Sequence, residues 1–127
     1  MKNKVKEEAI KTIVLGASPN PARYSFKAVK SLLRFGHEAI PIGFRPGVIY
    51  DKFIQRGMPE IENVHTIALY IGPERQEEYH DYILSLNPRR IIFNPGTMNE
   101  SFMEELENKG IEVVEGCTLV MLDSGEF

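Results

Sequence analysis

Short apolar runs alternate with helix-like segments along most of the chain, and this alternation constrains the fold more than any other feature. Apolar runs that predict buried strands lie at residues 12–15, 39–42, 66–71, 90–93 and 112–114. Amphipathic segments that predict helices lie at residues 25–35, 74–86 and 100–108. Strands that alternate with helices form βαβ units. We therefore expect an α/β fold: one doubly wound, Rossmann-like domain with a mostly parallel five-stranded sheet and helices on both faces.

The domain organisation follows from the length and from two less regular segments. A chain of 127 residues can bury a core of its own, so we assign residues 1–127 to one domain, with 1–10 as a flexible or helical lead. Residues 44–64 are rich in glycine and proline and predict an irregular connection with at most a short helix. The tail at 117–127 fits either a short helix or an added edge segment.

Composition excludes several classes of protein. The net charge of −3 argues against a nucleic-acid or membrane-surface partner. No apolar run approaches the roughly 20 residues that span a bilayer. The charged N-terminus lacks the apolar region of a secretory signal, and the single cysteine, Cys117, cannot form an internal disulfide. We predict a cytoplasmic protein, and one without a metal site, because no Cys/His cluster has ligand spacing.

The position of a ligand site follows from the expected sheet. Open α/β sheets bind ligands outside the carboxyl ends of the strands, where the strand order reverses. With the strand order 3-2-1-4-5, this crevice lies between the strands at 12–15 and 90–93. Its walls are then the loops GASPNPARYS, GFR, IGP and NPG, which all contain glycine or proline. His37 and His65 precede their strands and should lie at the opposite edge, so we expect these two and His80 to have surface or capping roles.

The loop after the first strand has the composition of a phosphate site. Gly16, Ala17 and Ser18 are small and offer backbone N–H groups, which we expect to be free. A helix that begins at Ser25 adds unpaired N–H donors and a partial positive charge. Arg23 supplies a formal charge that can clamp a phosphate. The alternative is that Ser25 only caps the helix and Arg23 is solvated.

The loop after the second strand indicates which phosphate ligand fits. An NAD site needs an acidic residue there for the ribose hydroxyls, but the chain has Gly43-Phe44-Arg45 and no carboxylate before Asp51. An arginine suits an extra ribose phosphate instead, as in NADP or coenzyme A (CoA). NAD is therefore the poor fit.

Two segments carry a family resemblance: VLGASPNPARYSFKAVKSLLRFGHEAIPI and IIFNPGTMNESFMEELENKGIEVVEGC. Over residues 10–120, the chain resembles the small stand-alone CoA-binding proteins of bacteria. These are similar to the CoA-binding domain of the succinyl-CoA synthetase α subunit and of ADP-forming acyl-CoA synthetases. The resemblance implies a CoA or acyl-CoA ligand. It also implies three groups of contact residues: Gly16, Ala17, Ser18, Arg23 and Ser25 at the ADP portion; Phe44 and Arg45 at the adenosine; Gly72, Pro73, Pro95 and Gly96 along the far wall.

This chain departs from the family at Ile42-Gly43-Phe44, where a Val-Asn-Pro turn is usual. The larger synthetases use a phosphorylated histidine from a second domain, and we expect no such domain here. Ser18, Ser25 and Cys117 lack a candidate base. We therefore expect no catalytic residue and a CoA-binding protein that acts as a carrier, sensor or regulatory partner. An NADP-type binder, or an interaction protein that has lost the ligand, are the alternatives, and both a homo-oligomer and a protein partner remain open.

Overall fold

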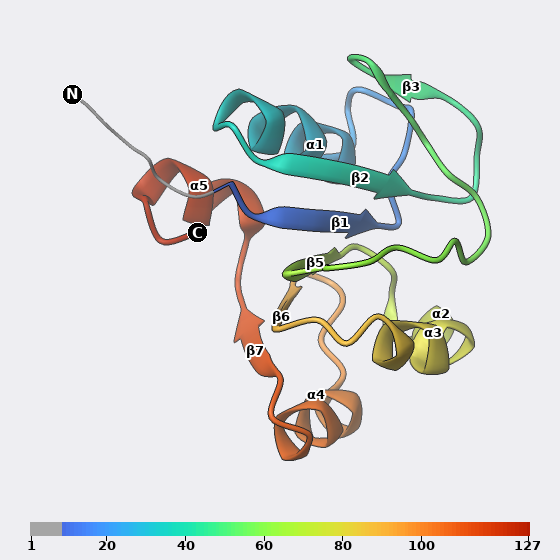
Figure 1. Cartoon of the computed structure of the whole chain (residues 1–127), viewed down its shortest axis with the longest axis vertical. Coiled ribbons are helices and arrows are strands. Elements are labelled where there is room, and N and C mark those ends of the chain that lie inside the picture. Colours follow the sequence, from blue (N-terminus) through green and yellow to red (C-terminus); the bar gives the residue numbers. More distant parts are fainter. Residues whose placement is uncertain (1–8) are drawn as a thin grey trace.

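A twisted parallel sheet forms the centre of the protein (Figure 1). The computed structural model describes residues 9–127; residues 1–8, which make up most of the predicted N-terminal lead, lie outside this part. The sheet has the order β2-β1-β5-β6-β7, and all four pairings are parallel, which confirms the predicted fold class. Its strands are β1 (Lys11–Leu15), β2 (Glu38–Ile42), β5 (Thr66–Leu69), β6 (Arg90–Phe93) and β7 (Glu112–Glu115).

The helices match the predicted segments, with one exception in detail. They are α1 (Tyr24–Arg34), α2 (Pro73–Gln76), the 3₁₀ turn η2 (Glu77–Tyr79), α3 (His80–Ser85), α4 (Glu100–Asn108) and α5 (Thr118–Ser124). The segment predicted at 74–86 is helical but divides into α2, η2 and α3. Asn99 caps α4, because its side chain accepts a hydrogen bond from the Phe102 N–H. The tail forms the helix α5, so the edge-segment alternative is wrong.

Helices cover both faces of the sheet and create two apolar layers (Figure 1). Successive side chains of β1 point to opposite faces, so Ile13 and Leu15 pack with α3 and α4 while Val14 packs with α1 and α5. The four residues of β5 and of β6 are all buried. Each fully buried Ile, Leu or Phe contributes about 1.5–3 kcal/mol to folding relative to an exposed position.

The strand order corrects the prediction. Numbered along the chain, the five strands lie in the order 2-1-3-4-5 and not 3-2-1-4-5, because β5 pairs with β1 and not with β2. The edge position suits β2, since Pro41 has no N–H to donate to a further strand. The all-buried β5 takes the central position instead. The strand order therefore reverses between β1 and β5, so the expected ligand crevice lies between these two strands and not between β1 and β6.

The stretch predicted as an irregular connection contains a small β-hairpin. Strands β3 (Val48–Ile49) and β4 (Lys52–Phe53) pair antiparallel, and the residues between them make a two-residue turn. Gln55 then bridges to Ile42 at the outer edge of β2. Strands of two residues are too short to show an alternating pattern, which explains why the sequence did not reveal them.

Candidate functional site

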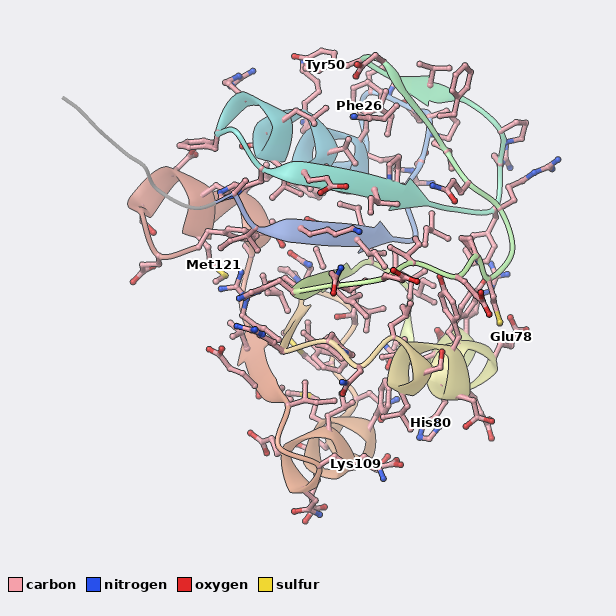
Figure 2. All side chains as sticks on the ribbon, viewed as in Figure 1. Phe26, Tyr50, Glu78, His80, Lys109 and Met121 are labelled. Atoms are coloured by element: carbon pink, nitrogen blue, oxygen red, sulfur yellow. The ribbon has the colours of Figure 1, made fainter. Side chains whose placement is uncertain are left out.

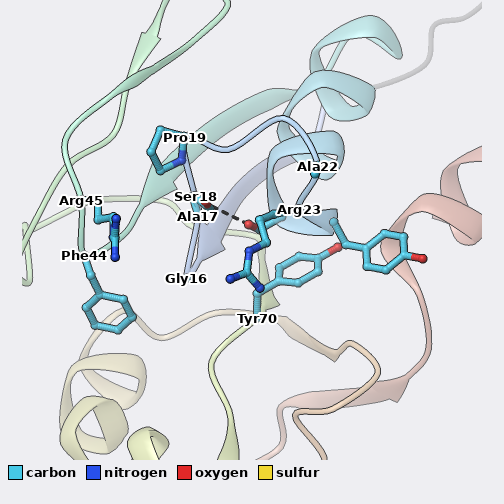
Figure 3. Close-up of a pocket in the computed structure, with 11 residues that line it drawn as sticks. Gly16, Ala17, Ser18, Pro19, Ala22, Arg23, Phe44, Arg45 and Tyr70 are labelled. Atoms are coloured by element: carbon cyan, nitrogen blue, oxygen red, sulfur yellow. Dashed lines mark hydrogen bonds between the residues drawn. The ribbon is translucent and has the colours of Figure 1, made fainter.

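Three strands end at the same level and open a pocket between their following loops. Leu15 of β1 lies opposite both Ile42 of β2 and Leu69 of β5, so the three loops start side by side. The pocket has a volume of about 430 Å³ (Figure 3). Its lining comes from the loop after β1, the start of α1, the loop after β2 and the residue after β5: Gly16, Ala17, Ser18, Pro19, Ala22, Arg23, Tyr24, Ser25, Phe44, Arg45 and Tyr70. Seven of the eleven predicted site residues are among these.

The N–H groups of the loop after β1 are already hydrogen-bonded within the protein, which corrects the expectation that they are free. The Gly16 and Ala17 N–H groups both donate to the Ile42 carbonyl, at 2.8 and 2.9 Å. The Ser18 N–H donates to the Ser25 hydroxyl at 3.1 Å (Figure 3). Ser25 therefore fixes the loop and does not cap the helix; the N-cap is Arg23. These bonds hold the loop in place beside the pocket, and its first three N–H groups are already used within the protein.

The donors for an anion come instead from the first turn of α1. Arg23 makes no side-chain capping hydrogen bond, and the turn contains no acidic residue. The first N–H groups of a helix have no acceptor within the helix, so those of Tyr24, Ser25 and Phe26 remain available. Together with the helix dipole they favour a negative group at this end of the pocket.

Two arginines line the pocket without a counter-ion. Figure 3 shows Arg23 and Arg45 on either side of the Gly16–Ser18 loop in this view. Neither side chain forms an ion pair or hydrogen bond with any residue that the structure describes. Arg23 lies at the N-terminus of α1 and Arg45 lies across the loop from it, and both residues are exposed to solvent. A guanidinium in either place can hold a phosphate through two parallel hydrogen bonds.

Glycine is required where the loops after β1 and β2 meet. A Cβ atom on Gly43 would lie 2.0 Å from the Ala17 carbonyl oxygen, so no larger residue fits without moving the backbone. Gly16 has a φ of +100°, a conformation that other residues rarely adopt. The departure from the family's Val-Asn-Pro turn at Gly43 thus has a structural reason: the second loop presses against the first.

The aromatic ring of Phe44 connects the pocket with α2. Its ring is stacked by the Arg75 guanidinium, whose carbon lies 3.9 Å from the ring centroid. The Tyr79 ring packs edge-on against it, with centroids 6.0 Å apart. Phe44 lines the pocket with 42% of its surface exposed, which leaves area for a planar ligand group to stack on.

Sequence reasoning missed Tyr70; Pro19, Ala22 and Tyr24 belong to the predicted GASPNPARYS wall but were not singled out as contact residues. Tyr70 directly follows β5, so the correct strand order would have placed it beside the first loop. Burial raises the pKa of the Tyr70 phenol; Thr118 nearby opposes this shift and Cys117 adds to it. The phenol is therefore neutral at physiological pH. Tyr24 is exposed at the rim, with the Lys27 ammonium 5.4 Å from its ring centroid.

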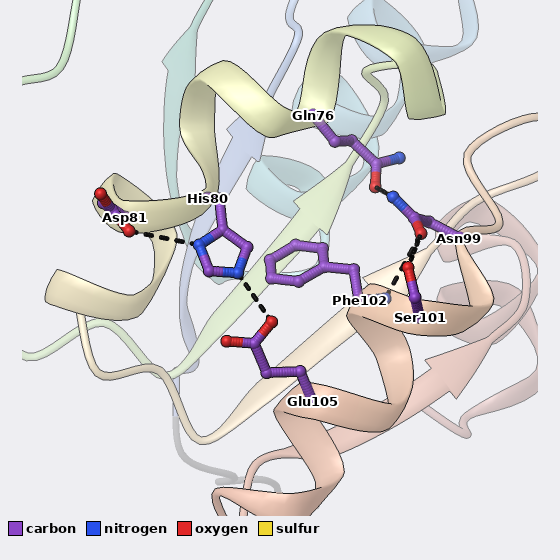
Figure 4. A network of polar contacts seen from close by, with 7 residues as sticks. All are labelled: Gln76, His80, Asp81, Asn99, Ser101, Phe102 and Glu105. Atoms are coloured by element: carbon purple, nitrogen blue, oxygen red, sulfur yellow. Dashed lines mark hydrogen bonds and ion pairs between the residues drawn. The ribbon is translucent and has the colours of Figure 1, made fainter.

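The remaining predicted residues, Gly72, Pro73, Pro95 and Gly96, do not line this pocket. The loops that carry them are joined by Gln76, which is buried and donates to the Ile71 and Thr97 carbonyls at 2.8 and 2.6 Å. Its side-chain oxygen accepts from Asn99 at 3.0 Å (Figure 4). Pro73 borders a separate, smaller hollow between α2 and α4. For Pro95 and Gly96, which follow β6, the reason is again the strand order, because β5 lies between β1 and β6.

The histidines lie away from the pocket. His37 and His65 precede β2 and β5 and so lie at the amino edge of the sheet, as predicted. His80 on α3 contacts Glu105 of α4 at 2.8 Å and Asp81 at 3.2 Å (Figure 4). Hydrogen bonds to Glu105 and then Asp81 raise its pKa.

Cys117 is partly buried at the N-cap of α5. Among the described residues, the pocket lining includes no histidine, cysteine or carboxylate.

The fold and the pocket define a doubly wound α/β domain with a pocket at its topological switch point. Comparison with known proteins specifies the family. The model of the CoA binding domain matches residues 11–123, and the chain therefore belongs to the CoA-binding domain family. A search of curated proteins finds no match.

Solved structures support the same assignment of the fold. An uncharacterized protein of known crystal structure is 49% identical, with a TM-score of 0.92 over 95% of this chain and 100% of its own. Prb, a PH1109 protein redesigned for binding, is 16% identical, with a TM-score of 0.81 over 93% of this chain and 84% of its own. Cell-free ID.343 from Thermus thermophilus is 20% identical, with a TM-score of 0.80 over 93% and 91%. At these lower identities, the last two matches show the fold alone.

No helix within residues 9–127 has both the length and the apolar character needed to cross a bilayer.

Proposed function

We propose that this protein binds CoA or an acyl-CoA in the pocket between the ends of β1, β2 and β5. The ADP portion lies against the loop after β1 and the N-terminus of α1. Arg23 and the first turn of α1 bind the diphosphate, Phe44 stacks on the adenine, and Arg45 binds the 3′-phosphate. The pantetheine arm leaves the pocket past Tyr70.

The observation that carries this proposal is the pair of pocket arginines that have no counter-ion among the described residues. An unpaired cation in a pocket is stabilised when an anionic ligand supplies the missing charge. Two such cations on opposite sides of the loop suit a ligand with phosphates at two places. CoA has a diphosphate and a separate 3′-phosphate; NAD has the diphosphate alone.

We further propose that the protein is not an enzyme on its own. Acid, base or nucleophilic catalysis needs a titratable or nucleophilic side chain beside the reacting atom. The described lining supplies two arginines, two tyrosines and two serines, and it includes no base to activate the serines. A carrier or regulatory role in the cytoplasm fits this lining, because such a role requires binding without turnover.

Isothermal titration calorimetry tests the ligand assignment. The protein is titrated with CoA, dephospho-CoA, NADP and NAD, and each titration is repeated on Arg23→Ala and on Arg89→Ala. Arg89 is an exposed arginine at the amino edge of the sheet, so it serves as the matched control. We expect CoA to bind tightest, Arg23→Ala to weaken CoA roughly tenfold or more, and Arg89→Ala to leave it unchanged.

Two results would overturn the proposal. NADP binding in preference to CoA would assign the pocket to a nicotinamide cofactor. No heat with any of the four ligands, in protein shown to be folded by circular dichroism, would leave a domain that has kept the fold and lost the ligand.

A further inference from the structure

The exposed apolar side chains of this protein are concentrated in one short segment. Isolated exposed apolar residues are normal, but a cluster marks an interaction surface. Nine large hydrophobic residues are exposed in the described chain, and five of them lie within residues 44–58. These five are Phe44, Val48, Tyr50, Phe53 and Met58.

The β3–β4 hairpin directs three of them away from the core. Val48 and Phe53 are cross-strand partners, so their side chains lie on the same face of the hairpin. Ile49 points the other way and is fully buried against α1 and the sheet. Tyr50 occupies the turn, with a φ of 57°, near the upper edge of the molecule in Figure 2. We call Val48, Tyr50 and Phe53 the hairpin face; Phe53 is 75% exposed.

Charge is distributed unevenly around this face. Residues 16–58 contain seven basic and two acidic residues, whereas residues 59–127 contain four basic and fourteen acidic residues. The Lys30 ammonium lies 5.5 Å from the Tyr50 ring centroid, and Lys52 and Arg56 belong to or follow β4. Asp51 in the turn is the one acidic residue of the hairpin, so two hairpin faces brought together would still place more cations than carboxylates against each other.

The same chain carries an acidic surface of opposite sign nearby. Glu74, Glu77, Glu78 and Asp81 are all exposed on α2, η2 and α3, and we call them the acidic segment. It adjoins the segment that leads into the hairpin, because Arg75 of α2 stacks on Phe44. Glu78 lies at the side of the molecule in Figure 2, away from Tyr50. Each copy of the chain thus presents both complementary surfaces.

We propose that the hairpin face of one copy binds the acidic segment of a second copy, and that two copies make this contact reciprocally in a two-fold dimer. In a two-fold interface, a contact between two surfaces occurs twice, once in each direction. Phe53 and Tyr50 supply the apolar anchors, since aromatic residues dominate the binding energy of protein interfaces. The lysines around them pair with the carboxylates of the partner copy. This inference does not depend on the ligand of the pocket.

Sedimentation velocity over a wide range of protein concentration, at low and at high salt, tests the proposal. We expect a dimer whose dissociation constant rises with salt, because ions screen its charge pairs. Phe53→Ser should raise that constant at least about tenfold. Val120→Ser should not, and it is the matched control, because Val120 is also an exposed apolar residue (59%) but lies on α5.

A mixing experiment tests which surfaces meet. Phe53→Ser weakens the hairpin face, and the double variant Glu77→Lys/Glu78→Lys weakens the acidic segment. A mixed pair keeps one intact contact of the two, so the mixture should dimerise more tightly than either variant alone. All substituted side chains are exposed, and circular dichroism verifies that each variant is folded.

The proposal is overturned by a monomer at every concentration. It is also overturned by a dimer that Phe53→Ser leaves unchanged. A dimer that tightens with salt and tolerates Glu77→Lys/Glu78→Lys would show that the hairpin faces pair with each other instead.

Discussion

The pocket and the contact between α2 and α4 lie at the same edge of the sheet. They differ in whether their polar side chains have partners within the protein. Near α4, Gln76 of α2 bonds two carbonyls and Asn99, and His80 of α3 bonds Glu105 of α4 and its neighbour Asp81. In the pocket, Arg23 and Arg45 have no such partners among the described residues. A polar group that is satisfied within the fold holds the structure together, whereas one left unsatisfied beside a cavity is available to a ligand. Substitutions in the two regions should therefore separate stability from binding.

The largest effect is expected at Gln76. Replacing Gln76 with Leu leaves the buried Ile71 and Thr97 carbonyls without their donor, and it should lower the free energy of unfolding by about 3 kcal/mol. Urea unfolding followed by circular dichroism measures this loss. CoA affinity, measured below the unfolding transition, should change little. A large loss of affinity in a folded variant would show that the two regions are coupled.

Gly43 lies at the contact between the two pocket loops and should affect both quantities. In Gly43→Ala, the new methyl group meets the Ala17 carbonyl, so the loop after β2 must move. We expect a loss of about 1–3 kcal/mol in stability and a clear loss of CoA affinity. Gly57→Ala is the control for the loss of a glycine, since a Cβ there meets no atom within 4 Å, although its positive φ adds some strain. Normal CoA binding by Gly43→Ala would show that the close approach is not needed.

Arg45 allows a test of which phosphate each arginine holds. Arg45→Ala should weaken CoA by roughly tenfold and leave dephospho-CoA, which lacks the 3′-phosphate, unchanged. Arg23→Ala should weaken both ligands. Calorimetry with the two ligands and two variants gives the comparison. Equal losses for both ligands in Arg45→Ala would assign this arginine to the diphosphate.

The smallest effect concerns His80 and depends on pH. Its carboxylate partners raise its pKa in the folded protein above the usual value, so folding favours the protonated form. The stabilisation is complete below about pH 6.5, the pKa of the unfolded state, and it disappears as the pH rises through the higher folded pKa. The stability of the wild type relative to His80→Gln should therefore fall between pH 6 and 9, by less than about 1 kcal/mol. A difference that is constant across this range would contradict the prediction.

The parts of the site that depend on local sequence were predictable, and those that depend on strand order were not. Gly16 to Ser18 and Arg23 follow one strand and precede one helix, so their proximity needs no knowledge of the sheet. Pro95 and Gly96 were assigned to the site because β6 was expected beside β1. Whether the third strand pairs with the first or the second depends on tertiary packing, and the same error concealed Tyr70.

The hydrogen bonds of the loop after β1 could not be predicted from the sequence either. Glycine and alanine after a strand suggest exposed N–H groups, but the acceptor of both, the Ile42 carbonyl, lies 26 residues beyond Gly16 and 25 beyond Ala17. Ser25 looked like a helix cap because serine is common at that position. Its hydroxyl binds the Ser18 N–H because the loop folds back over the helix start, which only the three-dimensional structure shows.

The two hydrogen bonds to the Ile42 carbonyl order the loop after β1 before a ligand binds. Since the Gly16, Ala17 and Ser18 amides are already bonded in the free protein, the loop does not need to order itself around a diphosphate. Its conformational entropy is lost when the chain folds and not when the ligand binds. Ligand binding should then proceed without a slow rearrangement, in a single kinetic phase whose rate rises linearly with ligand concentration. The exchange of these three amides with deuterated water should be as slow in the free protein as in the complex.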